Sequence, residues 1–461
     1  MRAFASRAPF ATTALLAGVL ASGALAARPV AAQPGAPAPD DAVSVPSEVD
    51  VRVDDLERLA VAAQPIRDGI FKIEGQGAVF LVNTKDGAVL VDTGFDNASS
   101  VAQKEVVDAL RTGPLRTIVL THSHQDHSGG LRLYAKERSA GAEVVAHNRY
   151  RYMSRHQLEP VAYFKRRYKR LYPTLVRTDP GVDRSYWQLV PDREVRPGQD
   201  WEFTLGDTRF RVIALQNSGE GEDALLVWLP DQRVLFTGDL FGTLYPMFPN
   251  LYTVRGEKVR DPLDYIDALD LVLALEPEVL VPGHFAVIEG EERIRASVTR
   301  MRDAVQFVWD ETVAAMNDGK TVWQAMGEIE LPPELRLSQG HGKVSWTVRA
   351  IWELLTGWYH GDSVANLYAV PPDAVHRDLV ELAGGPDALV ARARAHLEAN
   401  RPVEALRLLD VAASAETDAV LRLRIAVLER LRAQAKAGAD NYSEVALIDA
   451  ELREARAKLG E

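Results

Sequence analysis

The stretch Thr121-His122-Ser123-His124-Gln125-Asp126-His127-Ser128-Gly129-Gly130 holds three histidines and one aspartate within six positions. It follows Thr117-Ile118-Val119-Leu120, an apolar and β-branched run that predicts a buried strand. Only 10 histidines occur in 461 residues, so this density is far from random scatter. Side chains on one loop at a strand end can converge on a point, and imidazole and carboxylate are ligands that divalent metals such as zinc prefer. The stretch therefore predicts a metal site rather than a solvated polar loop.

The N-terminal residues are typical of an exported protein. Residues 1–32 read as a secretory signal, with Arg2 and Arg7 ahead of a small, apolar run at 11–26 and alanine-rich cleavage sites after it. A Pro/Ala-rich linker follows at 33–50. We expect a secreted or periplasmic protein without stable membrane insertion, with a retained N-terminal anchor as the alternative. The absence of cysteine excludes disulfides and thiolate metal ligands.

The charge of the chain narrows the choice of partners. A formal net charge of −12 argues against nucleic acid, which requires a basic surface. Residues 149–172 are a local exception, because eight arginines and lysines are interleaved with aromatic residues there. Two solvated amphipathic helices with ordinary core aromatics explain this composition. The other interpretations are a lid that presents cations and rings to an anionic amphiphile, and an RNA-binding surface.

Short apolar runs alternate with helical patterns from about residue 66 to 318, which predicts two sheets packed between helices. After Asp318-Gly319 helical patterns dominate, and 386–400 with 403–415 resembles a helical hairpin. We therefore expect a catalytic domain at 51–318 and an α-helical domain at 319–461. The fold class is α/β followed by an all-α C-terminal domain.

Further donors stand at other predicted strand ends. Glu220 lies just past a strand that ends at Leu215, Asp239 follows Val234-Leu235-Phe236, and His284 follows Val279-Leu280-Val281. Each polar residue adjoins a glycine, where the backbone can turn tightly. Each signal is weak alone, but together they supply the donors that a two-metal site needs.

In this order, His122-x-His124-x-Asp126-His127, Thr237-Gly238-Asp239 and Gly283-His284 resemble the metallo-β-lactamase fold superfamily, and Val91-Asp92-Thr93-Gly94 matches as well. The resemblance covers roughly residues 66 to 300. It implies an αβ/βα sandwich with two divalent metal ions, zinc in the first place and Mn²⁺ or Fe²⁺ as alternatives. One metal would take His122 and His124, the other would take Asp126, His127 and His284, and Asp239 would bridge them. Asp92 would steady a ligand by hydrogen bonding.

Three features resemble the alkylsulfatase branch of that superfamily. The position 19 residues before Asp239, where the superfamily usually has a third histidine on the first metal, is Glu220. The segment 250–261 is similar to the one with which alkylsulfatases hold sulfate, and this implies Asn250 and Arg255 as substrate contacts. Residues 330–455 resemble the alkylsulfatase dimerisation domain, which implies a homodimer.

Two positions depart from the alkylsulfatase pattern. The bridging residue is Asp239 where alkylsulfatases carry glutamate. Trp346 stands where they carry a histidine that is a candidate acid for the leaving alcohol, and an indole cannot supply that proton. This loss weakens an alkyl sulfate substrate more than an aryl sulfate, whose leaving group is better.

The sequence thus predicts a dinuclear hydrolase that cleaves a small anionic ester, a sulfate ester first, with metal-activated water. Asp126 and Asp239 are the predicted catalytic residues. Two alternatives remain open. One is another hydrolase of the same fold, acting on a phosphoester, lactone or β-lactam. The other is a non-catalytic, secreted, dimeric binding protein.

Overall fold

The computed structural model describes residues 61–173, 189–217, 221–241, 247–359 and 363–461. The predicted signal at 1–32, the linker at 33–50 and Glu220 lie outside the described residues. Within the described ranges, no helix combines the length and the apolar character needed to cross a membrane.

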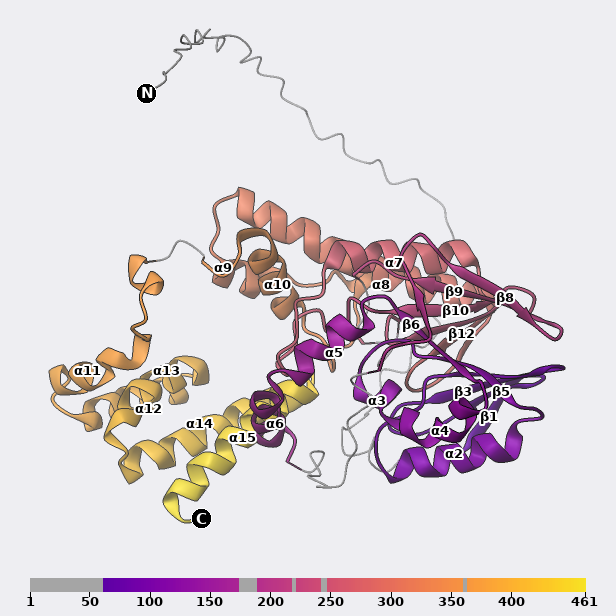
Figure 1. Ribbon diagram of the computed structural model, residues 1–461. Helices are drawn as coiled ribbons and strands as arrows, with labels where there is room; N and C mark the ends of the chain where they lie inside the picture. The colour runs from indigo at the N-terminus through magenta and orange to yellow at the C-terminus, as the bar shows by residue number, and fades with distance from the viewer. Residues whose placement is uncertain (1–60, 174–188, 218–220, 242–246, 360–362) are drawn as a thin grey trace, which may run out of the picture. The chain divides into compact units, whose positions relative to one another are not determined.

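Two sheets form the first part of the chain (Figure 1). The first sheet has seven strands in sequential order: β1 Ala63–Arg67, β2 Ile70–Ile73, β3 Val79–Thr84, β4 Gly87–Val91, β5 Leu115–Val119, β6 Glu143–His147 and β7 Arg193–Val195. The second sheet has six strands in the order β13-β12-β11-β10-β9-β8: β8 Trp201–Leu205, β9 Thr208–Ala214, β10 Leu225–Leu229, β11 Val234–Gly238, β12 Val279–Pro282 and β13 Ile288–Glu289.

Each sheet contains parallel strand pairs that bring strand ends to one edge. In the first sheet, β4, β5 and β6 run parallel to one another. In the second sheet, β11 and β12 are parallel, and Gly238 pairs with Pro282. Because the carboxyl ends of parallel strands meet at the same edge, the loops that follow them can combine their side chains there.

The sheets face each other across an apolar core. Val and Phe side chains of both sheets fill it, and Phe80 of β3 lies 5.3 Å from Phe236 of β11, centroid to centroid. The central strands β4, β10 and β11 are buried on both faces, which explains their continuous apolar runs.

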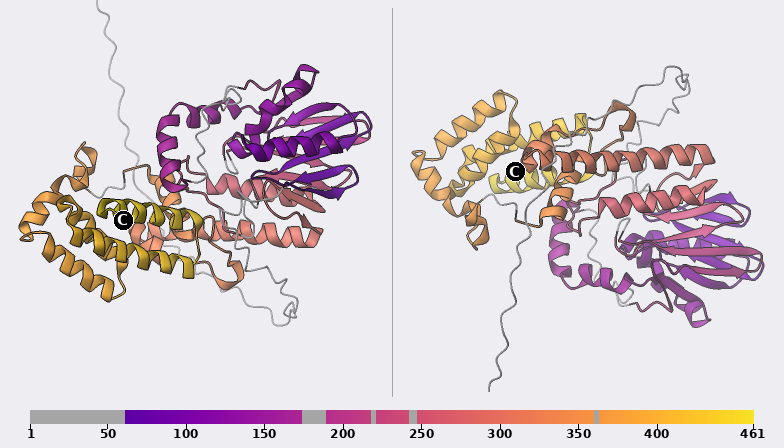
Figure 2. Two further views of the ribbon diagram at one scale, coloured as in Figure 1. Left: turned by 90° about the horizontal axis from the view of Figure 1, so that it is seen from below. Right: turned by 90° about the horizontal axis from the view of Figure 1, so that it is seen from above.

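Helices cover the outer faces of the sandwich, as Figures 1 and 2 show. On the first sheet, α2 Ala98–Leu110 buries Val107 in a second apolar cluster. On the second sheet, α7 Pro262–Leu275 and α8 Glu291–Asn317 build a third. The α7 helix begins where Asp261 accepts from the Leu263 amide, with Pro262 in the first turn. The predicted αβ/βα sandwich is confirmed.

The helices that lie between β5 and β7 in the chain are short: α3 Gln125–Ser128, η1 Gly129–Tyr134, α4 Ala135–Ser139, α5 Tyr150–Leu158 and α6 Val161–Leu171. The helices after α8 are α9 Val322–Glu328, η3 Pro333–Leu335, α10 Val344–Thr356, η4 Val364–Leu367, η5 Pro372–Val375, α11 His376–Leu382, α12 Pro386–Glu398, α13 Pro402–Ala412, η6 Ala413–Ala415, α14 Asp418–Ala437 and α15 Tyr442–Leu459. The expected all-α C-terminal region is confirmed.

The C-terminal helices use two different cores. Ala325 of α9 and Val348 of α10 pack with α8 in the cluster on the second sheet. Ala393, Leu409 and Val427, from α12, α13 and α14, belong to a separate apolar cluster. The predicted boundary at 319 falls in the turn between α8 and α9, and it stays a prediction.

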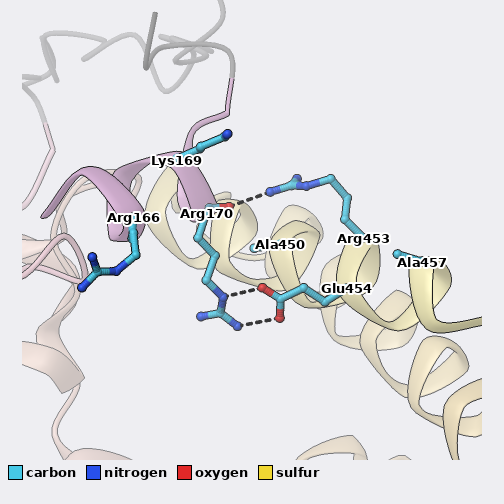
Figure 3. Close-up of a pocket in the computed structure, with 7 residues that line it drawn as sticks. All are labelled: Arg166, Lys169, Arg170, Ala450, Arg453, Glu454 and Ala457. Atoms are coloured by element: carbon cyan, nitrogen blue, oxygen red, sulfur yellow. Dashed lines mark hydrogen bonds and ion pairs between the residues drawn. The ribbon is translucent and has the colours of Figure 1, made fainter. Parts of the chain in front are cut away.

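Residues 149–172 form α5 and α6, and α6 contacts α15 (Figure 3). The Arg170 guanidinium donates to both carboxylate oxygens of Glu454, at 2.6 and 3.0 Å. Arg453 donates to the Arg170 carbonyl at 2.7 Å. The Tyr172 hydroxyl lies 3.0 Å from the Ser443 hydroxyl at the start of α15. Cations of the basic segment therefore connect α6 to the C-terminal helices.

Candidate metal centre

The histidine loop leaves the carboxyl end of β5. The β5 strand is buried between β4 and β6, and α3 begins directly after His124. The backbone amides of His127 and Ser128 both donate to the His124 carbonyl, at 3.1 and 3.0 Å. This tight turn brings the side chains of the motif onto one side of the loop.

One group of donors combines His122 and His124 with Asp239, which follows β11 in the other sheet. His122 Nε2 lies 3.0 Å from His124 Nδ1 and 4.0 Å from Asp239 Oδ2. One donor atom from each residue lies within 4.8 Å of the others.

A second group combines Asp126, His127, Asp239 and His284, again within 4.8 Å of one another. Asp239 Oδ1 lies 3.3 Å from His127 Nε2, and Asp239 Oδ2 lies 3.5 Å from His284 Nε2. Asp126 Oδ2 lies 3.3 Å from His284 Nε2. Asp239 therefore belongs to both groups, and four strand ends from two sheets build the site.

The second sheet presents Asp239 and His284 through a close approach of backbone. The Gly283 amide donates to the Gly238 carbonyl at 2.8 Å, where β11 and β12 end. A Cβ atom at Gly283 would lie 2.4 Å from Asp239 Oδ1 and 2.7 Å from His127 Cε1. Only glycine leaves room for both side chains at this point.

Asp92, at the end of β4, fixes the histidine loop by hydrogen bonds. It is fully buried, and its carboxylate accepts from His127 Nδ1 at 2.8 Å and from the Thr121 amide and hydroxyl at 2.7 and 2.8 Å. With its proton on Nδ1, His127 turns the lone pair of Nε2 toward Asp239.

The charges of the cluster fit a bound cation. Burial alone would lower the pKa of His127, but Asp239, Asp126 and Asp92 raise it well above its usual value. The same opposition of burial and carboxylates raises the pKa of His284 to about 9. In the buried His122, burial and the two neighbouring imidazoles lower the pKa. Positive charge is thus favoured beside the carboxylates.

The donor chemistry also fits a metal. His127 Nε2 is buried and has no hydrogen-bond partner among the described residues. Imidazole and carboxylate without thiolate suit zinc, manganese and iron(II) alike. The residues present therefore fit a divalent metal site.

Of the seven predicted ligands, the structure brings six together, and Glu220 lies outside the described residues. A nearby carboxyl group that the sequence reasoning missed is Asp223. It is buried, and burial raises its pKa to about 6, against the hydrogen bond with Ser123 that lowers it. Ser123 stands between His122 and His124, so Asp223 supports the histidine loop. Its position three residues after Glu220 is the signal that could have found it.

The predicted substrate contacts belong to the segment that brings Glu257 within 3.9 Å of His124. Asn250 is 2% exposed, and neither its Oδ1 nor its Nδ2 atom has a hydrogen-bond partner in the described part of the chain. Arg255 Nη2 lies 3.5 Å from Glu257, whose carboxylate is 3.9 Å from His124 Nε2. Arg167 of α6 donates to the Val254 carbonyl at 3.1 and 2.7 Å, which holds this loop in place.

Three more residues of the site had no role predicted from sequence. Glu257 and Arg260 form an ion pair at 2.6 Å within the segment of Asn250 and Arg255. His341 is buried, and burial followed by the charges of Arg255 and Arg260 lowers its pKa well below the usual value. Its ring stacks on the ring of Tyr442 of α15, with 5.6 Å between the centroids.

Trp346 is half-buried on α10, with the Lys343 ammonium 5.7 Å from its ring centroid.

Two family models match the chain. Residues 73–284 match the metallo-beta-lactamase superfamily, and residues 321–447 match the alkyl sulfatase dimerisation family. The two matched segments include all seven predicted metal ligands and most of the C-terminal helices.

Two proteins with similar sequences are named as sulfatases. The chain is 28% identical to a linear primary-alkylsulfatase of a Pseudomonas species, over 69% of this chain and 63% of the relative. It is 26% identical to the alkyl/aryl-sulfatase BDS1 of Saccharomyces cerevisiae, over 71% of this chain and 54% of the relative. The chain thus spans between half and two thirds of the length of these relatives.

A solved structure has the same fold. The stereoselective inverting sec-alkylsulfatase Pisa1 from Pseudomonas sp. superposes with a TM-score of 0.74 at 22% identity, over 86% of this chain and 66% of that chain. This likeness shows the fold alone, and the two family models describe its two parts. Residues 73–284 thus form a metallo-β-lactamase domain, and an alkyl sulfatase dimerisation domain follows at 321–447.

Proposed function

We propose that this protein is a metal-dependent hydrolase of sulfate esters. The observation that carries the proposal is the shared position of Asp239 in two donor groups. The buried Asn250 side chain, which has no hydrogen-bond partner among the described residues, supports it. The names of the similar proteins, which are alkylsulfatases, support the choice of ester.

The proposed centre holds two divalent metal ions, zinc before manganese or iron(II). His122, His124 and Asp239 would hold one ion together with Glu220, and Asp126, His127, His284 and Asp239 would hold the other. When bound, such ions lower the pKa of a water so that hydroxide is available near neutral pH. Asp239 and Asp126 supply the negative charge that retains the ions, and Asp92 fixes the ring of His127.

The loop of Asn250 and Arg255 is the proposed anion-binding end. The Asn250 amide offers two donor protons, and the guanidinium offers a planar fork that matches oxyanion geometry. Both side chains are largely buried, so their interaction with an anion is less screened than at an open surface. We propose that they orient the sulfate group toward the donor cluster.

The fate of the leaving group separates aryl from alkyl esters. Trp346 cannot donate a proton, and the lowered pKa of His341 keeps its imidazole neutral near pH 7. An aryl sulfate needs less protonation of its leaving oxygen than an alkyl sulfate does. We therefore expect turnover of aryl sulfates to be faster.

A turnover panel on the zinc-loaded protein tests the proposal. It compares 4-nitrophenyl sulfate, dodecyl sulfate, 4-nitrophenyl phosphate, a lactone and nitrocefin. We expect hydrolysis of 4-nitrophenyl sulfate above the other substrates, and its loss after chelation of the metal. Turnover of the phosphate ester without either sulfate would end the sulfatase proposal and favour a phosphoesterase of the same fold.

Two further proposals concern the molecule outside the site. The match to a dimerisation family and a strip of exposed apolar side chains over residues 354–382 support a homodimer. The signal-like residues 1–32 support export to the periplasm or medium. N-terminal sequencing of the mature protein from a culture would test export, and an intact Met1 in a cytoplasmic fraction would argue against it.

A further inference from the structure

A buried carboxylate stands inside the proposed anion-binding end, where a repulsive group is least expected. Glu257 Oε2 lies 2.6 Å from Arg260 Nη2, and Oε1 lies 3.5 Å from Arg255 Nη2. Oε1 also lies 3.9 Å from His124 Nε2. The Glu257 side chain is 13% exposed, so solvent screens its charge poorly.

The Glu257 carboxylate is paired with two guanidinium groups, those of Arg255 and Arg260. Pairing of this kind favours the charged form of a carboxyl group. The Glu257 side chain therefore brings a negative charge close to His124. Glu257 belongs to neither group of potential metal donors among the described residues.

Arg260 connects this carboxylate to the Asn250 amide. Its Nη1 donates to the Asn250 carbonyl at 2.7 Å, and its Nη2 pairs with Glu257. The Asn250 side chain, 2% exposed, keeps both of its polar atoms without a hydrogen-bond partner in the described residues. A polar group of a bound ligand would satisfy such a buried amide. Because Arg260 holds the Asn250 backbone, we expect this ligand next to the triad of Arg255, Glu257 and Arg260.

The triad has a definite charge. Among its own three side chains it has two guanidinium groups and one carboxylate. A sulfate monoester carries one negative charge, whereas a phosphate monoester carries close to two above a second pKa of about 6. The second charge of a phosphate would lie close to the Glu257 carboxylate, and like charges at such a distance in a buried site repel strongly.

We propose that Glu257 is a specificity residue that selects monoanionic esters over dianionic ones. This inference rests on the proposed function, because it concerns the substrate class of the same site. Discrimination by repulsion uses a group that binds no part of the correct substrate. The attractive contacts to the anion come from Asn250 and Arg255.

Two inert ligands test the proposal without turnover. Octyl sulfonate is a monoanion, and octyl phosphonate is a dianion above its second ionisation. Calorimetry at such a pH measures the affinity of each for the zinc-loaded protein. We expect Glu257→Gln to raise the ratio of phosphonate to sulfonate affinity by roughly tenfold or more, because one repulsive charge is lost. The ratio of kcat/KM for 4-nitrophenyl phosphate to that for 4-nitrophenyl sulfate should rise in parallel.

Matched variants separate charge from structure. Glu257→Asp keeps the charge and should keep the wild-type ratio. Asp231→Asn, in the turn between β10 and β11, removes an exposed carboxylate that pairs with Arg209, so it should leave the ratio unchanged. The double change of Glu257→Gln with Arg260→Gln restores the net charge of the triad and should return the ratio toward wild type.

The outcomes decide between the two proposals. An unchanged affinity ratio in folded Glu257→Gln, or an equal rise in Glu257→Asp, would overturn the inference and leave Glu257 as a structural clamp of the loop. If Glu257→Gln does not fold, a double variant with a ratio far from wild type has the same consequence. A wild-type protein that hydrolyses no sulfate ester but shows the expected change in ligand affinity would contradict only the proposed function.

Discussion

At the scale of single residues, the candidate site depends on groups that orient the donors as much as on the donors themselves. Asp92 accepts three hydrogen bonds within the described residues, and each comes from the histidine loop. Partners of this kind fix the ring orientation of a metal-binding histidine. The Asp92 carboxylate therefore controls the position of His127 Nε2.

Asp92→Asn tests this control. The amide would place an N–H group toward either His127 or Thr121, where the carboxylate now accepts. We expect the affinity for zinc to fall by about 10- to 100-fold, the range typical of such partners. Competition with a chromogenic chelator measures it. Asp108→Asn, on the outer helix α2, should keep the wild-type affinity. Equal affinities in all three proteins would contradict the role of Asp92.

The metal ligands predicted from the sequence share one property: each belongs to a short motif next to a strand end. His122, His124 and Asp126 lie within five positions, so their convergence needs only the local turn. Glu257 lies more than 130 positions after His124, and its place beside that ring depends on the path of a loop that has no periodic pattern. His341 comes from a still more distant segment. Contacts of this kind come from tertiary packing, which a motif does not encode.

At the scale of secondary structure, the predicted elements with strong apolar runs match the structure closely. The strand predicted at 279–281 is β12 Val279–Pro282, and the strand predicted at 234–236 is β11 Val234–Gly238. The edge strands β1 and β7 were not predicted from the sequence. Four of the five residues of β1 are exposed, and β7 has three residues, so neither carries a readable alternation. The sheet supplies their order through pairing with a neighbour.

His147 connects the ends of two such elements across the sandwich. It ends β6, and its Nε2 donates to the Leu215 carbonyl after β9 at 2.9 Å, while its Nδ1 accepts from the Arg149 amide at 3.0 Å. Both ring nitrogens are thus satisfied in the neutral form. Burial, the larger cause, and the charge of Arg149 lower the pKa of His147 to about 4, against the hydrogen bond to Leu215 that raises it. Protonation would remove the acceptor for the Arg149 amide.

This pairing predicts a pH dependence of stability. Between pH 6.5, the usual pKa, and about pH 4, the unfolded chain binds a proton that folded His147 refuses, so stability falls as the pH decreases. The loss reaches about 3 kcal/mol. We expect metal-free His147→Gln to lose less stability than wild type over this range. Urea unfolding at several pH values measures the difference, and parallel curves for the two proteins would contradict the assignment.

At the scale of the whole molecule, the C-terminal helices contact the site through two connections. The first runs through α6: Arg170 of α6 pairs with Glu454 of α15. Arg167 of the same α6 donates to the Val254 carbonyl, next to Arg255 in the chain. Asn441, at the start of α15, donates to the carbonyls of Gln339 and His341 at 2.8 Å. The helical region thus supports the proposed anion-binding loop from two directions. A fixed loop of this kind is less costly to order when an anion binds.

The same region exposes an apolar strip at residues 354–382. Its large side chains include Trp358 at 74% exposure and Leu382 at 84%. The other members are Leu354, Leu355, Val364, Leu367, Tyr368, Val370, Val375 and Leu379. Exposed large apolar side chains at this density along the chain are typical of a protein interface. We therefore expect the strip to form the contact between two copies of the chain.

Leu382→Asp tests the homodimer at this strip. A charge buried in an apolar contact loses its hydration, and a change at a hot-spot position costs about 2 kcal/mol or more, so the dimer dissociation constant should rise by roughly 30-fold or more. Sedimentation equilibrium measures the mass as a function of concentration. Val403→Asp is the matched control, because Val403 is 54% exposed on α13, outside the strip, and should leave the dimer intact. A monomeric wild-type protein would refute the dimer, and a Leu382→Asp protein that dimerises as tightly as wild type would place the interface elsewhere.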